Sequence, residues 1–321
     1  MRLGLITDSL GAQPLEQALD TVAGLGLDTV ELATGNWSEA PHVDLDRLLS
    51  DASARASLLD SIRSRGLELD ALNANGNQLH PVSGPEHDRV VRGTIELAAE
   101  LGVGTVVLMS GLPGARGEQA PNWITTSWPP ETVEILDYQW NEVAAPYWTD
   151  LAEFARRRGV RLAVEMHGTQ LVYNVASLQR LREIAGPDVV GANLDPSHLM
   201  WMGADIIQVI RALGDAIFHV HAKDVRIDRD NAGVNGLLDP LPPAAVAERS
   251  WNFVTLGLGH PGGERFWADF VYELRRVGFD GVLSIEHEDV LVNSVEGLQR
   301  SADLLRRVVL RDEPDWKPAD I

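Results

Sequence analysis

The feature that most constrains this chain is a regular alternation of short apolar segments with longer amphipathic ones, repeated about eight times. The apolar segments are rich in Val, Ile and Leu and mostly uninterrupted by polar residues. This pattern is typical of parallel strands that are buried on both faces. We predict strands at residues 3–8, 29–34, 67–73, 105–110, 161–167, 189–195, 217–224 and 281–287.

The amphipathic segments predict helices at residues 15–25, 45–65, 87–101, 132–158, 175–184, 205–213, 264–277 and 294–310. Several of these helices stop at a glycine just before the next strand, as at Gly102 and Gly159, which is a common helix stop. Eight such units favour the α/β class and a closed (β/α)8 TIM barrel, because an open sheet would leave unpaired edges. The alternative is a doubly wound open sheet, but no Gly-rich dinucleotide motif follows the first strand.

We expect a single domain spanning residues 1–321, with two long loops at 111–130 and 225–263. Both loops follow predicted strands, the fourth and the seventh, at the end of the barrel where such enzymes keep their active sites. Long structured loops in this position are usually lids or binding walls. The polar tail at 311–321 is expected to lie over the surface or on a neighbouring subunit.

Composition excludes several functional classes. The 27 Lys and Arg residues against 47 Asp and Glu residues give a net charge of −20, which disfavours nucleic acid and anionic membranes as partners. The absence of cysteine excludes disulfides, thiolate nucleophiles, iron–sulfur clusters and Cys-type zinc sites. No apolar run reaches the roughly 18 residues of a membrane span, and Asp8 comes too early for a signal peptide. We therefore expect a cytoplasmic protein.

Acids and histidines gather where the last four predicted strands end. Their segments read Glu165-Met166-His167, Asp195-Pro196-Ser197-His198, His219-Val220-His221-Ala222-Lys223-Asp224 and Glu286-His287-Glu288. A lone acid or histidine at a strand end is usually a cap, an ion-pair partner or a wall residue. Four strand ends that each bring acids or histidines into an apolar context are costly to bury, unless these side chains are paired or bind a metal.

The tips of consecutive barrel strands surround one rim, so Glu165, Asp195, His221 and Glu286 can converge. Three carboxylates and one imidazole suit a single divalent ion, with Mn²⁺ as the first expectation and Mg²⁺, Co²⁺ or Zn²⁺ as alternatives.

The ordered set of motifs resembles the xylose-isomerase-like barrel superfamily, a group of sugar phosphate isomerases and epimerases that also includes AP endonucleases. The resemblance spans nearly the whole chain and includes the glycine-rich segment from Gly257 to Gly263. It implies the metal ligands Glu165, Asp195, His221 and Glu286, and favours His221 over His219 as the ligand. The resemblance also implies that His198 faces the substrate or a second metal.

The Trp-rich region from Pro121 to Trp148, together with residues 75–81, resembles a branch that contains the catalytic subunits of bacterial C-glycoside deglycosidases. Members of that branch cleave a C–C bond of a 3-oxo-glucoside and work with a small partner subunit. The trinuclear metal set of the AP endonucleases has no clear match here beyond His80.

A metal site of this kind suits chemistry next to a carbonyl. Withdrawal of charge by the metal makes a sugar's α-hydrogen acidic, and a nearby base removes it to give an enediolate. The resemblance implies that Glu165 and Glu286 form the acid/base pair, and His167 and His198 are competing bases because imidazole titrates near neutrality. An equally open interpretation of His167 is that it belongs to the wall of the site and holds the Glu165 side chain in its conformation.

Four further residues are candidates for substrate binding: His80, Lys223, His260 and Trp128. For Lys223, pairing with the adjacent Asp224 is slightly favoured over stabilising an oxyanion. Packing within a loop is the alternative for His80 and His260. The tryptophans form either an aromatic wall for a sugar or flavonoid ring, or the loop's own small core, which we expect for at least two of Trp123, Trp128, Trp140 and Trp148.

The leading hypothesis is a divalent-metal-dependent sugar isomerase or epimerase that works through an enediolate. The second is a C-glycoside deglycosidase subunit, the third a non-catalytic sugar-binding barrel, and the most distant a phosphodiesterase of the AP endonuclease type. The expected partner is a sugar or a glycoside, not nucleic acid or a membrane. We also expect a homo-oligomer, with a small partner subunit if the deglycosidase hypothesis holds.

Overall fold

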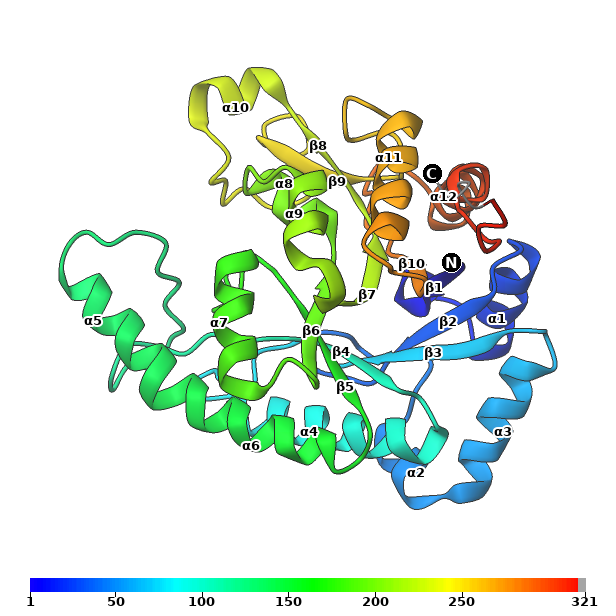
Figure 1. Cartoon of the computed structure of the whole chain (residues 1–321), viewed down its shortest axis with the longest axis horizontal. Helices are drawn as coiled ribbons and strands as arrows, with labels where there is room; N and C mark the ends of the chain where they lie inside the picture. Colours follow the sequence, from blue (N-terminus) through cyan, green and yellow to red (C-terminus); the bar gives the residue numbers. More distant parts are fainter. Residues whose placement is uncertain (317–321) are drawn as a thin grey trace, which may run out of the picture.

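Eight parallel strands close into a barrel in a computed structural model that describes residues 1–316 (Figure 1). Each predicted strand is present, with bounds that differ by at most two residues at either end. The barrel strands are β1 (Arg2–Ile6), β2 (Thr29–Ala33), β3 (Glu68–Asn73), β4 (Thr105–Met109), β5 (Arg161–Glu165), β6 (Val190–Leu194), β7 (Ile217–Ala222) and β10 (Val282–Ile285). The strand order around the barrel is β1-β10-β7-β6-β5-β4-β3-β2, so the prediction of a closed barrel is confirmed.

The barrel closes where β1 pairs with β10, with Leu3 opposite Leu283 and Leu5 opposite Ile285. These four side chains are fully buried. Apolar side chains on both faces of every strand account for the uninterrupted Val, Ile and Leu runs in the sequence, because one face fills the barrel and the other packs under the helices.

Helices surround the barrel (Figure 1). They are α1 (Leu15–Gly24), α2 (Leu45–Ser50), α3 (Ala52–Arg63), α4 (Gly84–Leu101), α5 (Glu131–Asp137), α6 (Ala145–Arg156), α7 (Val175–Ala185), α9 (Ile206–Leu213), α11 (Glu264–Arg276) and α12 (Ser294–Val308). The stop signal read at Gly102 has a structural basis, since this residue has a φ of 73° and donates its N–H to Ala98 and Ala99.

The single helix predicted at 45–65 is wrong, because Asp51 divides it into α2 and α3. Asp51 adopts an extended conformation and its carboxylate accepts the N–H groups of Ser53 (2.8 Å) and Ala54 (3.2 Å), so it caps a new helix. The region predicted as one long helix at 132–158 is helical over nearly its whole length. It is not a single α-helix, however, because a π-helical segment, η2 (Tyr138–Ala144), joins α5 to α6.

The segment predicted as a long loop at 225–263 is itself folded. It contains an antiparallel hairpin, β8 (Asp224–Ile227) and β9 (Trp251–Val254), with α10 (Arg229–Asn235) between the strands. A further short helix, α8 (Pro196–Trp201), follows β6 and was not predicted. Both additions stand at the C-terminal end of the barrel, so the walls of that end are built from regular structure.

The other predicted loop, 111–130, is irregular. It packs against buried tryptophans, and the sequence predicted that at least two tryptophans of this region would form a small core. Trp140 and Trp148 are buried, and the Trp148 indole donates its N–H to the Ser110 carbonyl (3.1 Å). Trp128, in contrast, is 75% exposed.

Within residues 1–316, no helix is long and apolar enough to cross a membrane. Of the predicted tail at 311–321, residues 317–321 lie outside the described part of the chain. Arg311, where the tail begins, forms an ion pair with Asp28 (2.9 Å).

One carboxylate joins the hairpin to the glycine-rich segment that follows β9. Asp224 is fully buried and accepts the N–H groups of Gly257 (2.9 Å), Gly259 (3.3 Å) and His260 (3.0 Å), as well as the indole N–H of Trp267 (3.3 Å). Burial raises the pKa of this carboxyl, while these donors oppose the rise.

We predict that Asp224→Ala lowers the free energy of unfolding by about 3 kcal/mol or more, because it leaves several buried donors without an acceptor. Chemical denaturation followed by circular dichroism measures this change. The matched control is Asp228→Ala, which removes the N-cap of α10 and costs only about 1 kcal/mol. Equal losses for the two variants would contradict this account of Asp224.

Candidate active site

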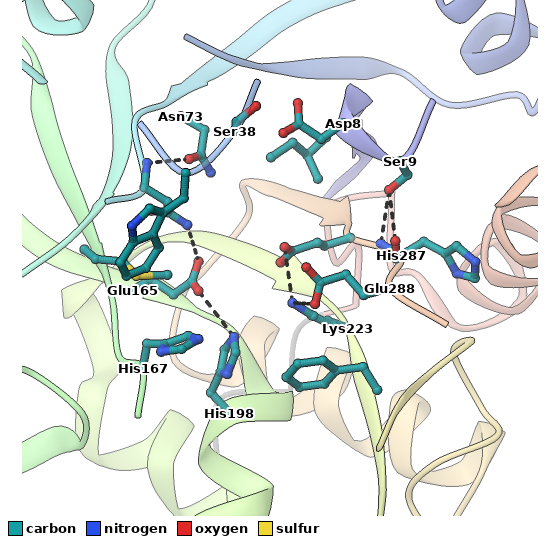
Figure 2. A pocket seen from close by; sticks show the side chains of 16 residues that line it. Asp8, Ser9, Ser38, Asn73, Glu165, His167, His198, Lys223, His287 and Glu288 are labelled. Atoms are coloured by element: carbon teal, nitrogen blue, oxygen red, sulfur yellow. Dashed lines mark hydrogen bonds and ion pairs between the residues drawn. The ribbon is translucent and has the colours of Figure 1, made fainter. Parts of the chain in front are cut away.

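A cavity of about 320 Å³ opens at the C-terminal end of the barrel, and we call it the candidate pocket. Figure 2 shows Glu165, His167, His198 and Lys223 around it, and Glu286 lines it as well. All five are from the predicted set. The opposite wall, formed by residues at or just beyond the ends of β1, β2 and β3, was not predicted. It contains Asp8, Ser9, Trp37, Ser38, Asn73 and Asn75.

His221 lies at the floor of this site, fully buried on β7. Its Nδ1 is 3.3 Å from Glu165 Oε2 and 3.0 Å from Glu286 Oε2. One ligand atom from each of these three residues lies within 4.8 Å of the other two, which is close enough for a shared ion. The structure thus brings together three of the four residues proposed as metal ligands.

The fourth residue, Asp195, ends β6 and caps α8 by accepting the N–H of Ser197 (2.8 Å). Its second oxygen, Oδ2, is 3.3 Å from His198 Nε2, which is itself 3.4 Å from Glu165 Oε1. His198 therefore stands between Asp195 and Glu165.

Three buried atoms of this group, His221 Nδ1, Glu286 Oε2 and Asp195 Oδ2, have charged neighbours within 3.3 Å but make no hydrogen bond of good geometry. Buried polar atoms without well-directed hydrogen bonds are costly, and a ligand contacted by all three would offset that cost. One nitrogen and several carboxylate oxygens form a donor set that suits a divalent cation. The residues present therefore fit a metal ion.

The most connected residue of the site, Glu31 on β2, was not predicted. Its carboxylate accepts hydrogen bonds from His219 Nε2 (2.9 Å), His221 Nε2 (3.0 Å), Ser284 Oγ (2.8 Å) and Asn73 Nδ2 (2.9 Å). A carboxylate only accepts, so His221 donates Nε2–H and presents its Nδ1 to Glu165 and Glu286. The only sequence signal was an acid inside an otherwise apolar strand.

Glu31, His219 and His221 also form a group whose ligand atoms lie close enough to hold an ion. The hydrogen bonds already made to Glu31 by Ser284 and Asn73 favour a supporting role instead, in which Glu31 orients the histidine that faces the pocket.

The carboxylates of the site are ionised because cations surround them. Burial alone would raise the pKa of Glu286, but Lys223 and His221 outweigh burial and lower that pKa to about 2. Burial opposes ionisation of Glu31 in the same way, and His221 and His219 hold the pKa of Glu31 well below its ordinary value. Asp195 differs, since burial raises its pKa to about 6.

Lys223 does not pair with its neighbour Asp224, so the preference stated for that pair is wrong. The Lys223 ammonium is 3.2 Å from Glu286 Oε1 and 2.7 Å from Glu288 Oε2 (Figure 2). Successive residues along an extended chain point in opposite directions, so Asp224 is directed towards the glycine-rich segment and Lys223 towards the pocket.

His167 lines the pocket beside His198, with 3.9 Å between the ring centroids. Its Nδ1 is hydrogen-bonded to the Gly168 carbonyl, which fixes a tautomer with Nε2 free to accept a proton. Burial lowers the pKa of both imidazoles, and both are therefore neutral near pH 7. Glu165 is held by Asn75 (3.1 Å) and Asn193 (3.0 Å), not by His167.

Three residues predicted to bind substrate do not line the candidate pocket. His80 accepts the N–H groups of Val82 (3.1 Å) and Ser83 (3.2 Å) just before α4. His260 accepts the N–H of Gly262 (3.0 Å) and stacks on Phe266, and Trp128 extends towards solvent. The two histidines stabilise loops, which is the alternative that the sequence left open.

Comparison with known proteins identifies the family of this chain. The family model for the xylose isomerase-like TIM barrel matches residues 19–308. The chain is 45% identical over 314 residues to "Uncharacterized protein YfiH" of Bacillus subtilis (strain 168), covering 96% of this chain and 99% of that protein. A stretch of 77 residues is 30% identical to inosose dehydratase of Geobacillus kaustophilus (strain HTA426), covering 24% of this chain and 25% of that enzyme.

Solved structures with the same fold include an L-ribulose 3-epimerase, with a TM-score of 0.64, 18% identity and coverage of 96% of this chain and 94% of the other. Another is an IOLI protein with a bound zinc atom, with a TM-score of 0.66, 21% identity and coverage of 96% and 98%. At these identities the two likenesses show the fold alone. The match of the family model over residues 19–308 establishes that this chain belongs to the xylose isomerase-like TIM barrel family.

Proposed function

We propose that this protein is a divalent-metal-dependent sugar isomerase or epimerase, which removes a proton from the carbon next to a carbonyl. The observation that carries the proposal is the convergence of His221 Nδ1 with carboxylate oxygens of Glu165 and Glu286 beside the open pocket. The buried atoms of this group that lack a well-directed hydrogen bond support a cation at that point.

The proposed ligands are Glu165, Asp195, His221 and Glu286. When bound, a divalent ion would stabilise the negative charge that develops on the carbonyl oxygen of a sugar, which makes the neighbouring C–H acidic. Mn²⁺ remains our first expectation, and a zinc-bound relative of the same fold keeps Zn²⁺ as an alternative.

His167 is the base that the geometry favours. Its tautomer leaves Nε2 as an acceptor within the pocket, and burial keeps the ring neutral. Glu286, with its lowered pKa, is a weaker base than an imidazole. In the proposed reaction His167 takes the proton from carbon and returns it to the adjacent carbon, while the proton of the neighbouring hydroxyl passes to the former carbonyl oxygen, and the sugar is thereby isomerised. Return to the opposite face, which epimerises it, requires a second proton donor.

The chain supplies charge stabilisation of its own. Lys223 is 3% exposed, and Glu286, Glu288 and Asp195 outweigh the effect of burial and raise its pKa well above the ordinary value. Its ammonium is therefore charged and lines the pocket, where it favours a negatively charged oxygen.

A dehydration is the second candidate function. It begins with the same proton removal but expels a hydroxyl group from the next carbon as water. The 77-residue similarity to an inosose dehydratase favours this outcome, and the charged Lys223 is available as a proton donor to the departing oxygen.

We predict that Glu286→Gln lowers both the bound divalent metal and the exchange of substrate C–H with solvent, while the fold stays intact. The loss of metal affinity should exceed the roughly 10–100-fold cost of removing an outer hydrogen-bond partner. Elemental analysis gives the metal content, and NMR in D₂O over a set of free ketoses and inososes gives the exchange. Deuterated ketose indicates isomerase chemistry, and a deoxy product indicates dehydration.

The matched control for this prediction is Glu288→Gln, which neutralises the neighbouring half-exposed acid. That variant should keep its metal. Wild-type metal content and exchange in Glu286→Gln would refute the proposed site.

We also predict that Glu31→Gln weakens metal binding by about 10–100-fold, because the amide no longer fixes His221 as an Nε2–H donor. Isothermal titration with Mn²⁺ measures the affinity. Ser284→Ala serves as the control, since it removes one hydrogen bond to the same carboxylate without touching a histidine. If Ser284→Ala weakens Mn²⁺ binding as much as Glu31→Gln does, orientation of His221 is not the cause.

Finally, we predict that His167→Gln lowers the exchange rate by about 10²–10⁴-fold, the usual contribution of a general base, while metal content stays at the wild-type level. Single-turnover exchange in D₂O and elemental analysis of the same sample test the two halves of this prediction. An exchange rate within twofold of wild type would remove His167 from the mechanism.

A further inference from the structure

A second cavity, of about 360 Å³, lies at the same end of the barrel, and we call it the aromatic cavity. Four segments that are far apart in the sequence form its walls. Trp123 comes from the loop after β4, Tyr173 from the segment after β5, Leu199 and Trp201 from α8, and Leu238 from the segment between α10 and β9. Both of the long segments predicted as lids or binding walls therefore meet in this cavity.

Aromatic rings dominate these walls. Trp123 packs edge-on against Tyr173, with 5.6 Å between the centroids, while Trp201 lies parallel to Trp251 at 4.8 Å. Leu238 is 73% exposed, so the cavity has an apolar side chain directed at solvent. Concave apolar surfaces with a few polar groups are the usual form of a small-molecule site.

Two indole N–H groups in these walls have no acceptor among residues 1–316: those of Trp123 and Trp201. Three other tryptophans do have acceptors for their indole N–H: Trp148 donates to Ser110, Trp251 to Leu237 and Trp267 to Asp224. A buried donor without a partner is costly. The two unpaired donors are both found in the walls of this one cavity.

The aromatic cavity and the candidate pocket are lined by neighbouring residues of the chain, although no residue lines both. His198 and Trp201 stand three residues apart on α8, with His198 lining the pocket and Trp201 lining the cavity. His167 lines the pocket, and a methyl group on the next residue, Gly168, would lie 2.4 Å from the Trp201 ring. The backbone beside the proposed base is therefore in tight contact with the wall of the cavity.

We propose that the aromatic cavity binds a second ring of the substrate, attached to the sugar that reacts in the candidate pocket. The ring has a flat apolar face that packs on the indoles, and oxygen atoms that accept hydrogen bonds from Trp123 and Trp201 once these side chains adjust to it. The candidate pocket, at about 320 Å³, is near the lower end of the roughly 300–1,000 Å³ of ligand sites, so a second ring needs separate space.

This inference rests on the proposed function for the pocket next to it, but the binding step can be measured separately. A phenolic ring and a second pyranose both have the required chemistry. Phenyl β-D-glucopyranoside and cellobiose represent these two sources, and D-glucose represents the sugar without a second ring.

The experiment is isothermal titration of the full-length protein, prepared without added metal, with each of these three compounds. We expect one of the two-ring compounds to bind at least about tenfold more tightly than D-glucose, because it buries an additional ring. Trp201→Phe and Trp123→Phe keep a ring but remove the donor, and each should raise the Kd of that compound by about fivefold. Trp316→Phe, at a tryptophan that is 76% exposed, should leave the Kd unchanged.

Tighter binding of phenyl β-D-glucopyranoside identifies an aromatic ring, and tighter binding of cellobiose identifies a second sugar. Equal affinity of all three compounds, or no effect of either cavity variant in a protein that is folded by circular dichroism, would overturn the proposal. Two-ring binding without any solvent exchange on ketoses would instead contradict only the proposed function. Exchange without two-ring binding would contradict only the aromatic cavity.

Discussion

The site depends above all on the carboxylate of Glu31, which is buried within the barrel and joins four strands. From β2 it accepts hydrogen bonds from residues on β3, β7 and β10, two of them histidines. A single charge in this position would be very costly to bury alone. Its donors offset that cost, and in doing so they determine which nitrogen His221 presents to Glu165 and Glu286.

The surrounding charges follow the same principle. Glu165, Glu286 and Glu288 stand next to His221 and Lys223, so each buried charge has an opposite charge within hydrogen-bond reach. Such clusters contribute little net stability, because removing the charges from water costs about as much free energy as their attraction returns. Their place at the C-terminal end of the barrel, beside an open pocket, is therefore better explained by chemistry than by folding.

The segments outside the barrel have different structural roles at its C-terminal end. The hairpin β8–β9 brings Phe253 to the candidate pocket and Trp251 to the stacked pair with Trp201, while Asp224 fixes the glycine-rich segment behind it. The proposed reacting groups thus come from the ends of the strands, the residues just after them and α8, and the added segments shape the space around these groups. This arrangement lets one barrel serve different substrates by changing its loops.

Sequence alone determined the barrel, because eight apolar runs and glycine helix stops are local signals that survive without knowledge of contacts. It also placed Glu165, His221 and Glu286 at strand ends that had to meet once the barrel closed. Only tertiary structure decided the roles of Glu31 and Asn75, whose partners are distant in the sequence, and directed Lys223 to Glu286 instead of Asp224. The same holds for His80 and His260, since a histidine in a loop looks alike in sequence whether it faces a ligand or its own backbone. Which groups share a buried space is a property of the closed fold, and no local pattern encodes it.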